Sequence, residues 1–476
     1  MKKNVSSQTH SVTATKKSGT RSRYPRYVFS IFFIISFLNY LDRNIFIGAS
    51  NAIAKDLHLS LAQLGYIASA FLIVYTLTTI PLGLWADRAS RKNVVALGVA
   101  VWSLTTALTA LATNFAFAFF SRMLLGVGEA GYFPAGTALL SDYFNRQQRA
   151  RIMSYWNVAQ YVGVFVGYAI GGILAGMGLW REAFLIAALP GLLMAILCWR
   201  IREPRRNQAD EEAALAASEI EPIAPAIPIP LLTDGEQPPR RRDQTFIQQC
   251  RLLLSIKTLL VLMVIQIFAF FVLGVNVTYL PIYLQQVDTF HLSQQFTGVY
   301  SGGIIILAGL TGNILGGIFS DLLQRRYAGA RILICGISFL IGAPLIVLTL
   351  EARNFVIFSI LLFLTVTMLA IYNGPSTAAT QDIVPSWLRS SSIALSLFVA
   401  HLLGDAFAPT IIGLLATSLD PTHGQHFAHN LAGHELGFAI LITCTPALVI
   451  AGLAGILGSR WMKADVEAAT RAEQSI

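Results

Sequence analysis

Twelve long apolar segments limit what this chain can fold into. They lie at residues 28–50, 62–84, 93–113, 115–140, 153–177, 182–200, 257–284, 296–319, 331–350, 354–381, 390–417 and 436–459. A helix needs about 20 apolar residues to cross a bilayer, and the segments have about this length. Only 12% of the 476 residues are charged and the mean hydropathy is +0.61, which excludes a water-soluble globule. We therefore predict an all-α integral membrane protein with twelve transmembrane helices.

The positive charges gather on one side of the expected membrane. If the N-terminus is cytoplasmic, 29 Lys and Arg residues face the cytoplasm, two lie within the membrane, and Lys55, Arg181 and Arg353 face the opposite side. Loops rich in Lys and Arg stay on the cytoplasmic side, so we expect both termini in the cytoplasm, with the chain in the cell (inner) membrane. The net charge of +9 then reflects topology and does not indicate nucleic-acid binding.

A polar stretch with seven prolines separates the first six segments from the last six. Its composition cannot bury a core and is typical of a loose linker, which serves either as a tether or as a regulatory segment. The expected organisation is a cytoplasmic N-terminal tail (1–27), a six-helix half (28–200), a cytoplasmic linker (201–250), a second six-helix half (251–460) and a cytoplasmic C-terminal tail (461–476).

Charged turns recur in the two halves. Asp87 and Arg91 follow the second segment, Asp321 and Arg325 follow the eighth at an offset of 234, and a second pair of turns repeats at an offset of 240. Two parallel six-helix repeats are typical of secondary transporters. Ion pairs at helix ends can latch two halves in one conformation, although topology and helix capping alone also explain such charges. The residues assigned to gating are Asp87, Arg88, Arg91, Asp142, Arg149, Asp321, Arg325, Asp382 and Arg389.

Four ionisable residues lie inside apolar segments: Asp42 and Arg43 in the first, Arg122 and Glu129 in the fourth. Each costs about 2.5–3.5 kcal/mol at the centre of a membrane helix, so the group implies pairing, water access or function. Counted at about 1.5 Å per residue, Asp42 and Glu129 reach a similar depth, where both can face one cavity. We expect Asp42 or Glu129 to exchange a proton and Arg43 or Arg122 to bind an anionic substrate. A structural buried ion pair is the alternative.

His401 and Asp405 are spaced i, i+4 in the eleventh segment and can contact each other. Histidine titrates near neutral pH, so the pair is either a proton relay or a structural contact. Two ligands make a poor zinc site and no third lies within sequence reach, so no metal is expected.

Polar and aromatic residues near the charges complete the expected substrate site. Besides the two arginines, they are Asn39, Tyr40, Tyr132 and Asn373. The chain has no Gly-x4-Gly-Lys-Ser/Thr loop, so ATP-driven transport is not expected and an ion or substrate gradient must supply the energy. We expect no cofactor and no enzymatic activity.

Several stretches resemble known transporters. Residues 83–92 resemble the loop after helix 2 of the major facilitator superfamily, and residues 39–43, 126–132 and 401–405 with Pro409 resemble its Spinster-type members. The resemblance implies the major facilitator fold and an alternating-access carrier that exports amphipathic lipids, such as lysophospholipids or sphingosine phosphate, with proton coupling. Its partners would be the substrate, protons and the lipid bilayer, and we expect a monomer.

A smaller substrate fits the same charges. An arginine near mid-membrane suits a phosphate or a carboxylate, so it also fits a sugar acid or an aromatic carboxylate taken up with protons. The anion:cation symporter branch of the superfamily works in this way. A lipid would favour an apolar cavity with a lateral opening, and a small anion would favour a closed polar cavity.

Overall fold

The computed structural model describes residues 24–206, 208–220, 246–422 and 425–474. In these ranges the chain forms helices and no strand, which confirms the predicted all-α fold. The helices of the first half are α1 (Tyr24–Asp56), α2 (Leu61–Arg88), α3 (Arg91–Ala110), α4 (Phe115–Ala130), α5 (Tyr132–Tyr143), α6 (Arg146–Gly176) and α7 (Trp180–Arg200).

The second half contains a comparable series. Its members are α10 (Lys257–Gln285), α11 (Gln294–Gln324), α12 (Ala330–Glu351), α13 (Phe355–Ala370), α14 (Asn373–Ile383), η2 (Ser386–Leu388), α15 (Arg389–Ala400), η3 (His401–Asp405), α16 (Ala408–Leu419) and α18 (Gly433–Gly458). The remaining helices, α8 (Gln208–Ile220), α9 (Phe246–Leu253), α17 (Gln425–Ala428) and α19 (Met462–Gln474), lie outside the membrane-spanning series.

Eleven spans among the described residues are long and apolar enough to cross a membrane. The predicted fourth segment is divided into α4 and α5 at Gly131, and neither part alone is long enough. Taken together, α4 and α5 complete the twelve predicted spans. The twelve-helix architecture is therefore confirmed.

The halves repeat at an offset of 240 residues between α3–α5 and α12–α14. Asn114 caps α4 by accepting a hydrogen bond from a backbone N–H, and Asn354 caps α13 in the same way. Both spans are interrupted at the equivalent place, beside Tyr132 and Tyr372. The repeat predicted from the charged turns therefore extends through whole helices.

Glycines bring helices of the first half into backbone contact. A methyl group at Gly167 of α6 would lie 2.5 Å from the carbonyl oxygen of Leu41, so only glycine allows α6 to approach α1 this closely. Gly163 and Gly171 face the α1 backbone in the same way. This glycine stripe packs α6 inside its own half.

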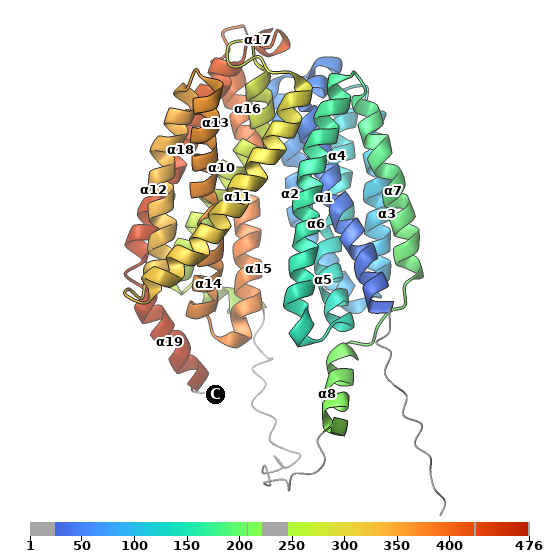
Figure 1. Cartoon of the computed structure of the whole chain (residues 1–476), viewed down its shortest axis with the longest axis vertical. Coiled ribbons are helices and arrows are strands. Elements are labelled where there is room, and N and C mark those ends of the chain that lie inside the picture. The colour runs from blue at the N-terminus through green and yellow to red at the C-terminus, as the bar shows by residue number, and fades with distance from the viewer. Residues whose placement is uncertain (1–23, 207, 221–245, 423–424, 475–476) are drawn as a thin grey trace, which may run out of the picture.

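The two ends of the molecule differ. Figure 1 shows α8 and α19 at one end and α17 at the other. We call the first end the basic side, because its loops carry residues 87–92, 144–151, 325–331 and 384–389, and the other end the α17 side.

The two halves are joined on the α17 side. Asn51 of α1 donates to Gln285 of α10 at 2.8 Å, and the backbone N–H of Thr410 donates to Ser69 of α2 at 3.2 Å. Further hydrogen bonds in the same half of the molecule join Asn51 to Asn430, Ala62 to Thr417 and Gly48 to Gln294. The bundle is thus sealed on the α17 side, and its two halves diverge toward the basic side (Figure 1).

Candidate functional site

An ion pair between α1 and α4 lies at the centre of the candidate site. Arg43 Nε donates to Glu129 Oε2 at 2.5 Å. The side chain of Glu129 is fully buried, whereas that of Arg43 is 19% exposed. One turn before Glu129, Gly126 lets α4 pack closely against α2, because a methyl group there would lie 2.7 Å from the carbonyl oxygen of Phe71.

Asp42 and Arg122 complete the group predicted from the sequence. Thr106 of α3 donates its hydroxyl to Asp42 Oδ2 at 3.2 Å, and Arg122 lies within electrostatic range of both Asp42 and Glu129. Asp42, Arg43, Arg122 and Glu129 are therefore neighbours, and we call them the charge cluster. Asp42 Oδ1, Glu129 Oε1 and Arg122 Nε are buried and make no hydrogen bond within the described part of the chain.

The accessibility of the cluster differs from the expectation. Asp42 and Glu129 were expected to face a cavity, but each residue is only 1% exposed. The reason is local: Asp42 points to α3, and Arg43 covers the carboxylate of Glu129. In this conformation Arg43 is the cluster member with the larger exposed surface.

Aromatic rings surround the guanidinium of Arg43. Its central carbon lies 4.5 Å from the ring centre of Tyr75, 5.2 Å from that of Phe71 and 5.3 Å from that of Tyr40. These rings hold the cation by cation–π attraction while leaving the surroundings apolar. The site therefore presents one positive group among rings, which suits an anion attached to an apolar body.

The other predicted substrate residues are dispersed. Asn39 is buried on α1 one turn before Arg43. Tyr132 lies in the core of the first half, where its hydroxyl donates to the carbonyl of Phe32 and accepts from Trp156 Nε1 at 2.8 Å. Asn373 is exposed at the start of α14. The structure thus places Asn39 and Tyr40 beside the charge cluster, and gives Tyr132 packing partners.

His401 and Asp405 are in contact, as their spacing predicted. His401 Nδ1 lies 3.0 Å and 3.2 Å from the two carboxylate oxygens of Asp405, and the ring of Phe270 packs edge-on against the imidazole. The pair forms a π-helical turn, η3, in which the N–H of Ala406 donates to the carbonyl of His401. Turns of this type are frequent at functional sites.

The charged turns on the basic side form two equivalent ion pairs. Arg91 pairs with Asp142, and Arg331 pairs with Asp382. Both arginines lie in the first turn of a helix, and both pairs span 51 residues. The repeat of 240 residues therefore matches Arg91 with Arg331. The offset of 234 read from the sequence matches Arg91 with Arg325 instead, and the two offsets differ because the second half has extra residues in this turn.

The second repeated arginine caps a helix. Arg149 donates to the carbonyl of Ser141 at 2.6 Å, and Arg389 donates to the carbonyl of Gln381 at 3.1 Å. Each cation neutralises the negative end of α5 or α14. Arg149 also pairs with Asp210 of α8. Among the remaining gating residues, Arg88, Asp321 and Arg325 are exposed, and the side chain of Asp87 lies outside the described residues.

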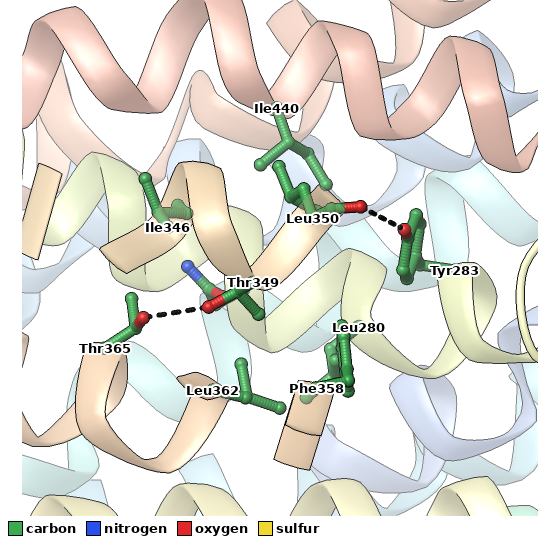
Figure 2. A pocket seen from close by; sticks show the side chains of 10 residues that line it. Leu280, Tyr283, Ile346, Thr349, Leu350, Phe358, Leu362, Thr365 and Ile440 are labelled. Atoms are coloured by element: carbon green, nitrogen blue, oxygen red, sulfur yellow. Dashed lines mark hydrogen bonds between the residues drawn. The ribbon is translucent and has the colours of Figure 1, made fainter. Parts of the chain in front are cut away.

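A separate pocket lies inside the second half (Figure 2). It is lined by Asn276, Leu280, Tyr283, Ile346, Thr349, Leu350, Phe358, Leu362, Thr365 and Ile440. The hydroxyl groups of Thr349 and Thr365 form a hydrogen bond across the pocket at 3.1 Å. The hydroxyl of Tyr283 donates a hydrogen bond to the carbonyl of Leu350. The lining is mainly apolar. All of its residues belong to the second half, whereas the charge cluster belongs to the first half.

Two functional neighbours were not predicted from the sequence. The contact of Thr106 with Asp42 could not be predicted, because the hydroxyl of a threonine inside an apolar helix usually donates a hydrogen bond to the backbone of its own helix. Arg331 could have been found, since it lies 240 residues after Arg91, the offset already seen for Asp142 and Asp382.

The twelve spans, the two repeated halves and the paired turns define an integral membrane transporter. The chain matches the family model of the Major Facilitator Superfamily over residues 32–409, and it belongs to that family. This result confirms the predicted fold and family, and the family consists of transporters and not of enzymes.

The chain is similar to several known members. It is 25% identical over 389 residues to the protein spinster of Drosophila melanogaster, covering 81% of this chain and 61% of that protein's length. It is 23% identical to the sphingosine-1-phosphate transporter of Danio rerio, covering 91% and 84% of the two chains. It is 28% identical to a probable galactarate/D-glucarate transporter of Escherichia coli (strain K12), covering 65% and 69%.

A solved structure has the same fold. It is a bacterial homologue of the human lysosomal transporter spinster in an inward-facing, unoccupied conformation, with a TM-score of 0.77 and 21% sequence identity, covering 93% of this chain and 98% of that chain.

Proposed function

We propose that this protein is a proton-coupled secondary transporter that moves an amphipathic anionic substrate, such as a lysophospholipid or a sphingosine phosphate, by alternating access. One observation carries the proposal. Arg43 holds the buried carboxylate of Glu129 while keeping part of its own surface exposed. One cation is thus shared between an internal carboxylate and any anion that enters.

The sharing supplies a coupling step. A substrate phosphate or carboxylate that binds Arg43 competes with Glu129 for the guanidinium. A buried carboxylate that loses its partner is costly, so Glu129 takes up a proton. Arg122 compensates in part, since it lies within electrostatic range of Glu129 and Asp42. Substrate binding and proton binding therefore favour each other.

The amphipathic assignment has independent support. The rings of Tyr40, Phe71 and Tyr75 around Arg43 suit an apolar body beside an anionic group. The similarity to a sphingosine-1-phosphate transporter is consistent with this class. A small organic anion, such as a sugar acid, is the second candidate, favoured by the similarity to a probable galactarate/D-glucarate transporter.

The orientation follows from charge. The basic side, which carries α8 and α19, is cytoplasmic by the positive-inside rule, and the chain resides in the cell (inner) membrane. The conformation sealed on the α17 side then corresponds to an inward-open carrier. His401 and Asp405 form a second proton relay in the other half. The ion pairs Arg91–Asp142 and Arg331–Asp382 act in gating.

The experiment that tests this function measures ligand-induced thermal stabilisation and flux. Lysophospholipids or sphingosine phosphate should raise the melting temperature of the purified wild type but not of Arg43→Gln. The matched control, Arg181→Gln, alters an arginine that pairs with Asp56 outside the cluster and should respond like the wild type. In liposomes, flux of the stabilising compound should depend on a pH gradient. Stabilisation by sugar acids alone would reject the lipid assignment.

A further inference from the structure

Half of the histidines in the chain lie in one short segment. Of eight histidines, four fall within residues 423–434: His423, His426, His429 and His434. His423 lies outside the described residues. The segment connects α16 to α18 on the α17 side, the end opposite α8 and α19 (Figure 1). Short tracts rich in histidine are typical of metal binding.

One of these histidines lies between two carboxylates. His426 Nδ1 is 2.8 Å from Glu435 Oε1 and 3.5 Å from Asp420 Oδ1, and the three ligand atoms lie within 4.8 Å of one another. Zinc binds histidine nitrogen and carboxylate oxygen at about 2.0–2.2 Å, which places tetrahedral ligands about 3.3–3.6 Å apart. The separation between His426 and Asp420 matches this spacing, and the shorter one between His426 and Glu435 is a hydrogen bond that the ion would replace.

The surroundings fix the carboxylate of Asp420. Asp420 is buried, and its oxygens accept hydrogen bonds from the backbone N–H of Thr422 at 2.8 Å and that of His426 at 3.2 Å. Such outer contacts orient a ligand before a metal arrives. Glu435 Oε2 is buried and has no hydrogen-bond partner among the described residues. The imidazole is partly exposed and leaves a path of entry.

We propose that Asp420, His426 and Glu435 bind a divalent transition-metal ion, with zinc as the best fit, and that this ion holds the α17 side closed. One nitrogen and two carboxylate ligands suit zinc, with water in the fourth position. The charge of the ion would balance the two carboxylates.

The position of the three ligands explains the effect on closure. They come from the end of α16, from α17 and from the first turn of α18, so one ion would tie three elements together. Asn430, four residues after His426, contacts Asn51 of the first half at 3.4 Å and accepts a hydrogen bond from the N–H of Val287 at 2.7 Å. The metal would therefore brace the segment that meets the opposite half.

Protons compete with a metal at this site. Histidine binds zinc as the neutral imidazole, so any proton on the ring must leave before zinc binds. Binding is therefore best measured at about pH 8.

The test is zinc titration of the full-length, tag-free protein by calorimetry at that pH. The wild type should bind one zinc ion, and magnesium should not replace it. His426→Gln and Glu435→Gln should weaken zinc binding at least about tenfold. His429→Gln removes an exposed histidine of the same segment and should bind zinc like the wild type. Equal melting temperatures in EDTA would show that the variants are folded.

A transport readout addresses the effect on closure. Zinc added on the α17 side should slow flux through the wild type and have at least about tenfold less effect on His426→Gln. Zinc affinity that is the same in all variants, or that falls as much in His429→Gln as in His426→Gln, would overturn the site. Zinc binding without any effect on flux would overturn the proposal that the ion holds the α17 side closed. The titration needs no substrate, so its result is independent of the proposed function.

Discussion

At the residue scale, Arg43 connects the buried charges to the exposed surface of the site. Its hydrogen bond to Glu129 uses Nε, and its guanidinium rests among three rings. The planar fork of arginine can engage more than one acceptor, which lysine cannot do with the same geometry. We propose that this property makes Arg43 the residue through which a substrate anion can reach Glu129.

Removing one partner of this pair should cost more stability than removing both. Arg43→Met leaves Glu129 buried without its cation and should lower the free energy of unfolding by about 3 kcal/mol. The double variant Arg43→Met/Glu129→Gln should recover most of that loss. Thermal unfolding of both variants in detergent gives the comparison. Equal destabilisation by the single and the double variant would show that the two side chains are not coupled.

The composition of the charge cluster was predictable at this scale, but its accessibility was not. Asp42 and Glu129 could be placed at one depth, because the rise of a helix is fixed. Their burial depends on the side chains of Arg43 and Thr106, which no periodicity in the sequence specifies. The hydrogen bond from Trp156 of α6 to the hydroxyl of Tyr132 is a further contact that no periodicity in the sequence specifies.

At the element scale, the two ion pairs of the basic side are equivalent in position but not in burial. The side chain of Asp142 is 7% exposed, whereas that of Asp382 is 35% exposed. A buried pair is costly to break, and an exposed pair contributes little. The two pairs should therefore respond differently to the same substitution.

We expect Arg91→Gln to slow transport and to destabilise the protein more than Arg331→Gln does. The estimated losses are about 2–3 kcal/mol for the first and about 1 kcal/mol or less for the second. Substrate affinity should change little in both variants, because neither arginine belongs to the charge cluster. Flux and melting temperature measured side by side check this ranking. A larger loss in Arg331→Gln would contradict it.

Close packing of α11 against α6 offers a second prediction at this scale. A methyl group at Gly298 would lie 2.6 Å from the carbonyl oxygen of Tyr168, at a contact between the halves. Gly298→Leu should therefore prevent closure of the α17 side and shift the protein toward a state that is open on that side. Distances between spin labels on the two halves would report the shift. Gly309→Leu is the matched control, since open space surrounds that position of α11.

The spans themselves were predictable from apolar length, yet their interruptions were not. Gly131 separates α4 from α5, and hydropathy does not encode this break. The π-turn at His401–Asp405 lies just before Pro409, a residue that cannot donate a backbone hydrogen bond and disturbs the regular helix pattern. Local chemistry of this kind, and not apolar length, positions the functional side chains.

At the scale of the whole molecule, hydrogen bonds join the two halves on the α17 side. The hydrogen bonds Asn51–Gln285 and Thr410–Ser69 seal the α17 side, and the halves diverge toward the basic side (Figure 1). Alternating access requires these contacts to break while new ones form at the other end. Substrate and proton can bias this equilibrium only through contacts that differ between the two states.

The central claim is that a substrate anion and Glu129 compete for Arg43, so that anion binding draws a proton into the protein. Calorimetric titration in buffers of different ionisation enthalpy measures this proton uptake directly. The wild type should take up protons when the substrate binds, and Glu129→Gln, which cannot ionise at that position, should take up fewer or none. Proton uptake that is absent in the wild type, or unchanged in Glu129→Gln, would contradict the account.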